Sequence, residues 1–517
     1  MTSIPRRPAE VVAVIPARGG SKGLPRKNLR LLGGIPLVVH AIRQAQSARE
    51  VQRVIVSTED DEIADVALGA GAEVLRRPPE LASDEATDLQ VFVHVLAALE
   101  EAEGAVPELL VQVRATSPVR RPPLIDLAIR TLRTDPAADS LRTVSLAAFT
   151  PYKMWTLDEK GIASPLLARE SHLLAKDWFD GPRQALPDAF EHDGLVDVVW
   201  SRTVRAGSMA GHRIIGLTHA DPAVDIDREA DLLDAERLLR PVAGAAARCD
   251  VGIRQGQLVP AWNGAPQRFP RGRWEEEFEL AARCGLPNIE LSIDRRDSDA
   301  NPVFAAAGRA DLVRVARRYG VTTASACLDD LLHNPLVHRP VEAFVGELAR
   351  DLSEVSVATA VFPLRGASAY RWPPPPELVA TLRRLGDQYA RFGIRIALET
   401  DLPGSDLFRF LGVVAHRNIG ICFDTGNPTA LGHETAEDVR LLGPAIWHVH
   451  VKDKDAFGVD VSLATGSTRI TAILAALHSA GYAGALTLEI PQGPIPTQAA
   501  ARFRDYVLSL WTCGTTY

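Results

Sequence analysis

Eight short apolar segments recur through the second half of the chain, and their spacing constrains the fold more than any other feature. Amphipathic stretches such as 274–285 and 376–393 separate most of them, with the periodicity of helices. Eight strands alternating with helices in about 260 residues is the size of a (β/α)8 or TIM barrel. We therefore predict a barrel with strands at 249–254, 288–293, 321–328, 354–363, 394–400, 418–426, 446–453 and 485–491.

The first half of the chain also alternates strands and helices. Strands are predicted at 11–17, 51–58 and 108–116, with helices at 35–48 and 61–72 between them. This alternation is typical of a parallel sheet covered by helices, and it predicts a Rossmann-like α/β domain. The stretch 240–248, RPVAGAAAR, has no periodicity of either kind, so we place the boundary there. The predicted domains are 1–240 and 249–517, joined by a linker at 241–248.

Composition narrows the class of protein. A chain of 517 residues exceeds one ordinary hydrophobic core, and 46% apolar with 24% charged residues is typical of globular proteins. The net charge of −8 argues against nucleic acid as a partner. We expect no membrane span and a cytoplasmic protein, because the first apolar run has six residues and no run reaches 18. Five cysteines, an odd number, indicate reduced thiols.

A glycine-rich, basic loop, IPARGGSKGLPRKN, follows the first predicted strand at 15–28. Its glycines allow a tight turn whose N–H groups approach phosphate oxygens. Arg18, Lys22 and Lys27 supply the cationic charge that a triphosphate and a departing pyrophosphate require. The loop is not a Walker A motif, since no Gly-Lys-Ser/Thr opens a helix. The plainer alternative is a surface loop with incidental basic residues.

Four further motifs follow in order: RPPELASD at 77–84, ATSPVR at 115–120, PRQALPDAF at 182–190 and DIDREADL at 225–232. With the loop, they make residues 11–240 resemble the acylneuraminate and 3-deoxy-sugar-acid cytidylyltransferases. The resemblance implies transfer of CMP from CTP to an acidic sugar with release of pyrophosphate. Lys22 and Asp227 would be catalytic. CTP would be held by Arg18, Gly19, Gly20, Ser21, Lys22, Lys27, Asn28 and Arg77.

The acidic residues Asp225 and Asp227 lie two positions apart on an extended segment, so their side chains point to one side. Such a pair can hold Mg²⁺ against phosphate oxygens, which is the metal site that the resemblance implies. Capping of the helix predicted at 227–239 is the structural alternative, and it would accompany the metal role.

The acceptor pocket departs from the family pattern. The resemblance assigns Arg114, Lys153 and Arg183 to the acceptor, but the family usually has Gln where Arg114 stands. Glu191-His192-Asp193-Gly194 replaces Arg-Pro-Asn-Gly, and Asp88 replaces a serine near the base. These charge changes predict that sialic acid is a poor acceptor. A second hypothesis is a non-sugar acidic acceptor such as a phosphonate.

Four potential metal ligands lie at the ends of barrel strands five to eight: Glu399, Asp424, His450 and Glu489. Barrel active sites form at the carboxyl ends of the strands, and three carboxylates with one imidazole suit Mn²⁺, Mg²⁺, Co²⁺ or Zn²⁺. Capping or buried structural roles are the alternative for each residue taken singly. His448 is interpreted as a core imidazole.

This set resembles the xylose isomerase-like sugar isomerases and epimerases over about 249–505. The resemblance implies that Glu399 and Glu489 both hold metal and move protons beside a carbonyl, while Lys452 binds an oxygen or phosphate of a sugar substrate. Asn427 stands where the family often has His. The same barrel occurs in a DNA-repair endonuclease, but that class needs more histidines and a basic track.

The sequence thus predicts a bifunctional enzyme: a CTP- and Mg²⁺-dependent cytidylyltransferase fused to a metal-dependent sugar isomerase or epimerase, which we expect to be a homodimer. The alternative for the barrel is an inactive scaffold, which would bind no metal tightly.

Overall fold

The computed structural model of the chain describes residues 10–513, except 22, 168–177, 183–185, 240–249, 260–268, 434 and 492–495. The chain divides into two compact units, Met1–Arg240 and Pro241–Tyr517. The predicted linker at 241–248 lies outside the described residues. Lys22 and Arg183, to which the sequence assigned roles in binding, lie outside them too.

A seven-stranded sheet forms the first unit, in the order β11-β7-β10-β6-β1-β4-β5. The predicted strands are present as β1 (Val11–Pro16), β4 (Arg53–Thr58) and β6 (Leu109–Gln112). The alternation of strands and helices predicts a parallel sheet, but the sheet is mixed, because β10 runs antiparallel to β6 and β7. The remaining strands are β5 (Glu73–Arg76), β7 (Ser140–Leu146), β10 (Phe190–Trp200) and β11 (Ile214–Thr218).

The central strand β1 is buried along nearly its whole length, as its unbroken apolar run predicts. Val12 and Val14 pack with Phe92 and Leu96 of a covering helix, so the sheet and this helix share one core. The loop after β1 therefore emerges at the carboxyl edge of the sheet, where open α/β sheets bind ligands. The helices are α1 (Leu37–Ser47), α2 (Asp61–Gly69), α3 (Asp88–Glu103), α4 (Pro122–Thr134), α5 (Ser201–Arg205) and α6 (Glu229–Leu239).

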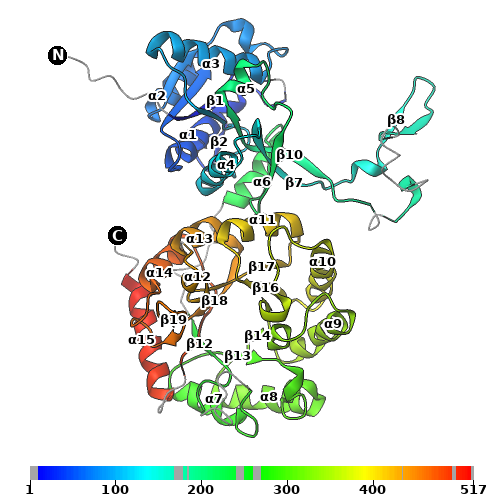
Figure 1. Ribbon diagram of the computed structural model, residues 1–517, viewed down its shortest axis with the longest axis vertical. Coiled ribbons are helices and arrows are strands. Elements are labelled where there is room, and N and C mark those ends of the chain that lie inside the picture. Colours follow the sequence, from blue (N-terminus) through cyan, green and yellow to red (C-terminus); the bar gives the residue numbers. More distant parts are fainter. Residues whose placement is uncertain are drawn as a thin grey trace, which may run out of the picture. The chain divides into compact units, whose positions relative to one another are not determined.

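Between β7 and β10 the chain forms an arm that stands apart from the sheet (Figure 1). The arm carries a short hairpin of β8 (Trp155–Leu157) and β9 (Ala163–Pro165). Several of its large apolar side chains are exposed, among them Leu157 at 70% and Ile162 at 63%. Such exposure in a contiguous segment is typical of an interaction surface.

A closed barrel of eight parallel strands forms the second unit, and all eight predicted strands are confirmed. Pairing of the first strand with the last closes the barrel, in the register Val251↔Leu486. The strands are β12 (Val251–Arg254), β13 (Ile289–Ser292), β14 (Ser325–Cys327), β15 (Thr359–Leu364), β16 (Arg395–Thr400), β17 (Ile419–Asp424), β18 (Ile446–Val451) and β21 (Leu486–Leu488).

Helices surround this barrel (Figure 1) and turn their apolar faces to the strands. A hairpin of β19 (Asp453–Lys454) and β20 (Asp460–Val461) is inserted after β18. No helix of the described residues is long and apolar enough to cross a membrane. The longer helices are α7 (Trp274–Arg283), α8 (Ala306–Tyr319), α9 (Arg339–Glu354), α10 (Pro376–Ala390), α11 (Gly404–Val414), α13 (Thr435–Leu442), α14 (Ile470–Ser479) and α15 (Pro496–Cys513).

Candidate functional sites

A cavity of about 290 Å³ opens beside the loop that follows β1. The loop 16–28 faces segments 77–91 and 112–116 across it, so the cavity brings several of the first unit's motifs together. Most residues that the sequence assigned to CTP or the acceptor line this cavity, namely Arg18, Gly20, Ser21, Lys27, Asn28, Arg77 and Arg114.

The loop after β1 is held in place by Glu59, which follows β4. The backbone N–H of Gly19 donates to Glu59 Oε1 at 2.7 Å, and Arg77 Nε donates to Glu59 Oε2 at 3.3 Å. Asn28 Nδ2 donates to the carbonyl of Arg18 at 2.9 Å, which ties the two ends of the loop together. One carboxylate thus positions both the glycine turn and the buried Arg77, whose pKa is lowered chiefly by burial.

The acidic segment 225–227 lies against this loop. A Cβ at Gly23 would lie 2.8 Å from the carbonyl of Asp227, so this close approach requires glycine. Ile226 is buried and donates its N–H to the carbonyl of Thr116, whereas Asp225 and Asp227 on either side of it are exposed. Lys27 Nζ donates to Asp227 Oδ1 at 2.8 Å. The lysine predicted to bind phosphate and the carboxylate predicted to bind metal therefore meet from positions 200 residues apart in the chain.

Capping of the following helix does not use the Asp227 carboxylate. Asp231, in the first turn of α6, accepts the N–H groups of the two residues that precede the helix, Asp227 and Arg228, on its Oδ2 at 3.0 and 2.8 Å. Asp231 thus holds the backbone of the acidic segment against the start of the helix.

The charges around Arg114 are compensated within the protein. Arg114 Nη2 donates to Asp197 Oδ2 at 2.9 Å, and the other oxygen of Asp197 contacts His192 Nε2 at 2.7 Å. Asp88 Oδ2, which the sequence placed near the base, accepts from Gln112 Nε2 at 2.7 Å and lies 3.5 Å from Arg114.

Asp193 points into the protein, which corrects the expectation that it adds repulsive charge to the acceptor pocket. Its oxygens accept from Thr143 at 2.6 Å and Ser145 at 2.8 Å, and they contact His219 Nε2 at 2.7 Å. Burial alone would raise the pKa of Asp193, but these hydrogen bonds, led by His219, lower it to about 2. Glu191, by contrast, is exposed on β10.

Lys153, which the sequence also assigned to the acceptor, does not line this cavity. Lys153 belongs to the arm, in the short helix Pro151–Lys153, and its Nζ donates to the carbonyl of Gly181 at 2.7 Å. Among the described residues that line the cavity, Lys153 does not appear.

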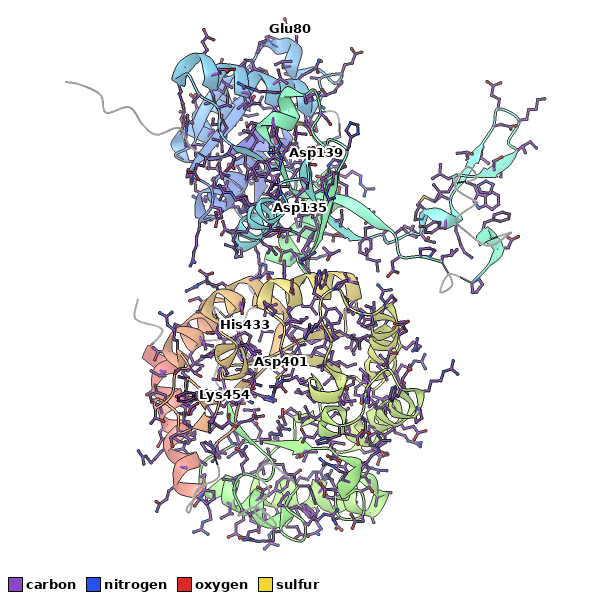
Figure 2. The ribbon with its side chains drawn as sticks, viewed as in Figure 1. Glu80, Asp135, Asp139, Asp401, His433 and Lys454 are labelled. Carbon is purple, nitrogen blue, oxygen red and sulfur yellow. The ribbon has the colours of Figure 1, made fainter. Side chains whose placement is uncertain are left out.

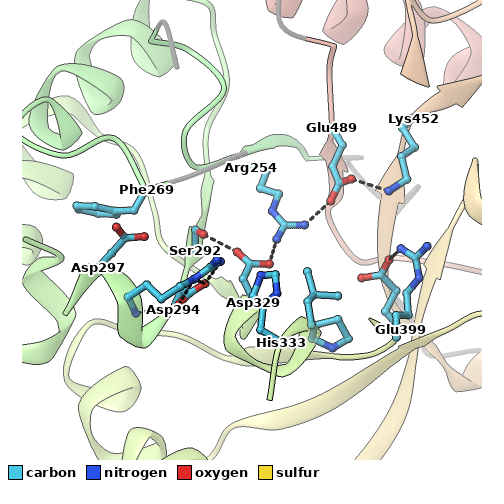
Figure 3. A pocket seen from close by; sticks show the side chains of 14 residues that line it. Arg254, Phe269, Ser292, Asp294, Asp297, Asp329, His333, Glu399, Lys452 and Glu489 are labelled. Carbon is cyan, nitrogen blue, oxygen red and sulfur yellow. Dashed lines mark hydrogen bonds and ion pairs between the residues drawn. The ribbon is translucent and has the colours of Figure 1, made fainter. Parts of the chain in front are cut away.

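In the barrel, a second cavity of about 300 Å³ lies at the carboxyl ends of the strands (Figure 3). Predicted residues Glu399, Lys452 and Glu489 line it, while Asp424 and His450 are buried beside them at 3% and 0% exposure. The other lining residues are Arg254, Phe269, Ser292, Asp294, Arg296, Asp297, Asp329, Leu332, His333, Pro363 and Arg365.

Each of the three predicted carboxylate ligands is paired with a cation of the chain. Lys452 Nζ lies 2.6 Å from Asp424 Oδ2 and 2.7 Å from Glu489 Oε2. Arg254 donates to the other oxygen of Glu489 at 2.5 Å (Figure 3). Glu399 Oε1 accepts from Arg365 at 3.1 Å and from Asn427 Nδ2 at 3.1 Å.

These pairs hold the Glu489 carboxylate ionised despite its burial. Burial raises the pKa of Glu489, but Lys452 and Arg254 more than offset it, and the pKa lies well below its usual range. For Lys452, burial lowers the pKa, whereas Asp424 and Glu489 raise it above the ordinary lysine range.

His450 is oriented by Glu290 on β13. His450 Nε2 contacts Glu290 Oε1 at 2.9 Å, and His448 Nε2 contacts the second oxygen at 2.7 Å. His450 Nδ1 then faces the candidate site, 3.4 Å from Glu489 Oε1 and 3.7 Å from Glu399 Oε2. This nitrogen is buried and has no hydrogen-bond partner among the described residues.

The donor set fits a divalent ion. Ligand atoms of Glu399, Asp424 and His450 lie within 4.8 Å of one another, so these three of the four predicted ligands can share an ion. Glu489 stands just outside that group. A second group with similar spacing consists of Glu290, His448 and His450. His448 therefore contacts the Glu290 carboxylate and is not only an imidazole packed in the core. In many metal sites a carboxylate binds one nitrogen of a histidine while the other nitrogen binds the ion. His450 has this arrangement, because Glu290 contacts its Nε2 and its Nδ1 is left without a hydrogen-bond partner among the described residues.

Sequence reasoning missed the polar residues contributed by strands one to four. Arg254 ends β12, Glu290 lies in β13, Asp329 follows β14 and Arg365 follows β15. Arg254 binds both Asp329 and Glu489, and Ser292 Oγ donates to Asp329 at 2.5 Å. Arg254, Asp329 and Arg365 lie at strand ends like Glu399 and Glu489, so the same signal marks them, whereas Glu290 lies inside β13 and carries no such signal.

Two family models match the chain. Residues 12–154 match the Cytidylyltransferase family, and residues 278–506 match the Xylose isomerase-like TIM barrel family.

Relatives resemble the first unit over part of their length. The CMP-N,N'-diacetyllegionaminic acid synthase of Legionella pneumophila is 34% identical over 29% of this chain and 64% of its own length. N-acylneuraminate cytidylyltransferase A of Danio rerio is 36% identical over 27% of this chain and 31% of its own. This chain therefore spans less than two thirds of these relatives. A xylose isomerase domain protein from Planctomyces limnophilus is 19% identical over 52% of this chain and 99% of that structure, with a TM-score of 0.42.

The sheet, the barrel and the family matches together show a nucleotidyltransferase-like domain and an isomerase-like barrel in one chain. More particularly, residues 12–154 lie in a cytidylyltransferase domain and residues 278–506 in a xylose isomerase-like TIM barrel.

Proposed function

We propose that the first unit transfers CMP from CTP to an acidic sugar and releases pyrophosphate. The observation that carries this proposal is the meeting of Lys27 with Asp227 at the glycine-rich loop, next to the cavity lined by Arg18 and Arg77. Phosphate transfer needs positive charge and a metal-holding carboxylate at one place. The names of the relatives, an N-acylneuraminate cytidylyltransferase and a CMP-N,N'-diacetyllegionaminic acid synthase, favour a sugar acid as the acceptor.

In this reaction an acceptor hydroxyl oxygen attacks the α-phosphorus of CTP, and the bond to the β-phosphate oxygen breaks. Gly20 and Ser21 present the loop to the phosphates, while Arg18 and Lys27 neutralise the leaving pyrophosphate. Lys27 exchanges its contact with Asp227 for a phosphate oxygen, which frees the carboxylate. Asp225 and Asp227 would hold Mg²⁺, which supplies positive charge at the phosphate oxygens.

The acceptor proposed is a sugar acid other than ordinary sialic acid. Arg114 stands at the cavity, but Asp197 already compensates its charge, and Glu191 is exposed on β10, the strand that carries Asp197. Pyrophosphate release from CTP, measured with a panel of keto-sugar acids and phosphonates, tests this. Efficient CMP transfer to sialic acid would contradict it, and turnover of a phosphonate alone would favour the non-sugar alternative.

We further propose that the barrel is a metal-dependent sugar isomerase or epimerase. Glu399, Asp424, His450 and Glu489 would hold the ion, which supplies polarisation of a substrate carbonyl. Glu399 and Glu489 come from strands five and eight, so one carboxylate takes the proton beside that carbonyl and the other returns it. Exchange of this hydrogen in D₂O, followed by NMR of a sugar panel, is the test.

A non-catalytic barrel is the second candidate, and one observation favours it. Every carboxylate of the predicted metal set already has a cationic partner within the chain, so the site is electrostatically balanced without an ion. Metal content decides between the two: an inactive scaffold retains no divalent ion after desalting, whereas the proposed enzyme binds one ion that Asp424→Asn removes.

A further inference from the structure

Lys452 occupies an unusual position at the end of β18. Its ammonium group is buried between two of the predicted metal ligands, 2.6 Å from Asp424 Oδ2 and 2.7 Å from Glu489 Oε2. The side chain reaches this place past Gly426, where a Cβ would lie 2.8 Å from Lys452 Cγ. A glycine at 426 thus leaves room for the lysine stem.

The oxygens that Lys452 contacts are the ones that a metal ion requires. Asp424 Oδ1 already accepts the N–H groups of Gly426 and Asn427 at 2.9 and 2.8 Å, so Oδ2 is its outward oxygen. Glu489 Oε1 is held by Arg254, which leaves Oε2. A divalent ion bound to both free oxygens, at about 2.0–2.6 Å, would lie against the ammonium and repel it.

We propose that Lys452 is an internal counter-cation that competes with the divalent ion for Asp424 and Glu489. When the ion binds, Lys452 swings into the cavity that it lines, and its ammonium is then available to an anionic or hydroxyl oxygen of the substrate. This inference rests on the metal site of the proposed function. It adds an order to the binding steps: the ion displaces Lys452, and Lys452 then contacts the substrate.

Two physical reasons support the exchange. Glu399 and Glu489 are already paired with Arg365 and Arg254, and Lys452 supplies the cation that Asp424 and the second oxygen of Glu489 contact in the absence of metal. The displaced ammonium then enters a polar cavity of about 300 Å³ whose wall carries the carboxylates of Asp294, Asp297 and Asp329. Because metal and an anionic substrate both favour the displaced lysine, each strengthens binding of the other.

The test is a Mn²⁺ titration of the full-length chain, with free Mn²⁺ read by electron paramagnetic resonance. The variants are Lys452→Met and the matched control Lys454→Met, which removes an equal charge two residues away. Lys454 is labelled in Figure 2. Lys454 pairs with Asp460, outside the predicted ligand set. Asp424→Asn identifies the binding event that belongs to the barrel. Lys452→Met is expected to bind barrel Mn²⁺ at least about tenfold more tightly, with Lys454→Met unchanged.

Affinity of Lys452→Met within about twofold of wild type, or weaker, overturns the competition. If wild type and Lys452→Met both bind no more Mn²⁺ than Asp424→Asn, the metal site itself fails, which is a separate result.

Labelling of the wild-type chain covers the case in which Lys452→Met does not fold. Acetylation by an amine reagent, mapped by peptide mass spectrometry, is expected to increase at Lys452 when Mn²⁺ saturates the barrel and to stay constant at Lys454. Unchanged or reduced labelling of Lys452 under Mn²⁺ would show that the ammonium does not leave its carboxylates.

Discussion

At the residue scale, buried or clustered carboxylates take distinct roles according to their partners. Asp227 is exposed and its carboxylate pairs with Lys27, so it can exchange that partner for a metal ion. Asp193 is enclosed by a histidine and two hydroxyl groups, so it holds structure. Asp424 and Glu489 combine both situations, because they are buried and paired with Lys452, the cation that we propose a metal ion displaces.

Asp227→Ala is expected to lower pyrophosphate release from CTP by roughly 10²–10⁴-fold, because a metal ligand at the phosphates is lost. Steady-state assays with Mg²⁺ measure this effect. Asp234→Ala is the control, since Asp234 is exposed on α6 and pairs with Arg237 of the same helix. Turnover of Asp227→Ala within about threefold of wild type would remove Asp227 from the metal site.

Asp193 predicts an acid-sensitive contribution to stability. Its pKa is about 2 in the folded chain against 3.8 for the ordinary carboxyl, so its stabilisation is present above pH 3.8 and is lost as the pH falls toward 2. Between pH 5 and pH 3 the wild type should lose about 1 kcal/mol of unfolding free energy through this group.

Asp193→Asn should lack that part of the pH dependence. Urea unfolding of both proteins at the two pH values measures the difference. Equal losses of stability in wild type and Asp193→Asn would show that Asp193 titrates alike in the folded and unfolded chain.

At the scale of elements, the candidate site residues lie at strand ends and in the loops that follow them, and buried side chains hold those loops in place by hydrogen bonds. Glu277 on α7 is 1% exposed, and its carboxylate accepts the N–H groups of Gly256 and Leu258 at 2.9 and 3.0 Å. It therefore fixes the segment after β12, the strand that ends in the site residue Arg254. Burial raises the pKa of Glu277 to about 7, although these backbone hydrogen bonds oppose the shift.

Glu277→Ala is expected to destabilise the barrel by about 3 kcal/mol, because it leaves at least two buried N–H groups without acceptors. Denaturant unfolding of the full-length chain measures it. The neighbouring Glu276→Ala serves as control, since Glu276 is exposed and pairs with Arg273 at the start of the same helix. Equal stability of the two variants would mean that the 256–258 segment finds other partners.

At the scale of the whole molecule, each of the two compact units carries a cavity whose walls bear charges of both signs. The arm of the first unit adds an exposed apolar surface that its own sheet does not cover, including Leu157 and Ile162. The expected homodimer would use this surface, because burying it removes apolar area from water.

Leu157→Asp combined with Ile162→Asp should convert the homodimer to a monomer, since it places charges within the apolar contact. Light scattering coupled to gel filtration measures the mass. Phe457→Asp is the control, as Phe457 is 92% exposed in the barrel's β19–β20 connection. A dimer that survives the arm substitutions must form through another surface, and a monomeric wild type would contradict the homodimer itself.

The amino-acid sequence by itself determines the features that depend on local periodicity and on strand ends. The eight barrel strands and the convergence of Glu399, Asp424 and His450 could be predicted, because parallel strands bring their carboxyl ends to one rim. The position of the glycine-rich loop after β1 could be predicted for the same reason.

Only the tertiary structure decided which charges meet. Arg254 reaches Glu489 across 235 positions and Lys27 reaches Asp227 across 200, while Asp193 turns inward and β10 runs antiparallel. The pattern of side chains along the sequence indicates which face of a helix or strand is buried, but it does not indicate which residues of other segments pack against that face. Those partners are set by packing of distant segments, and with them the balance of charge that governs metal and substrate binding.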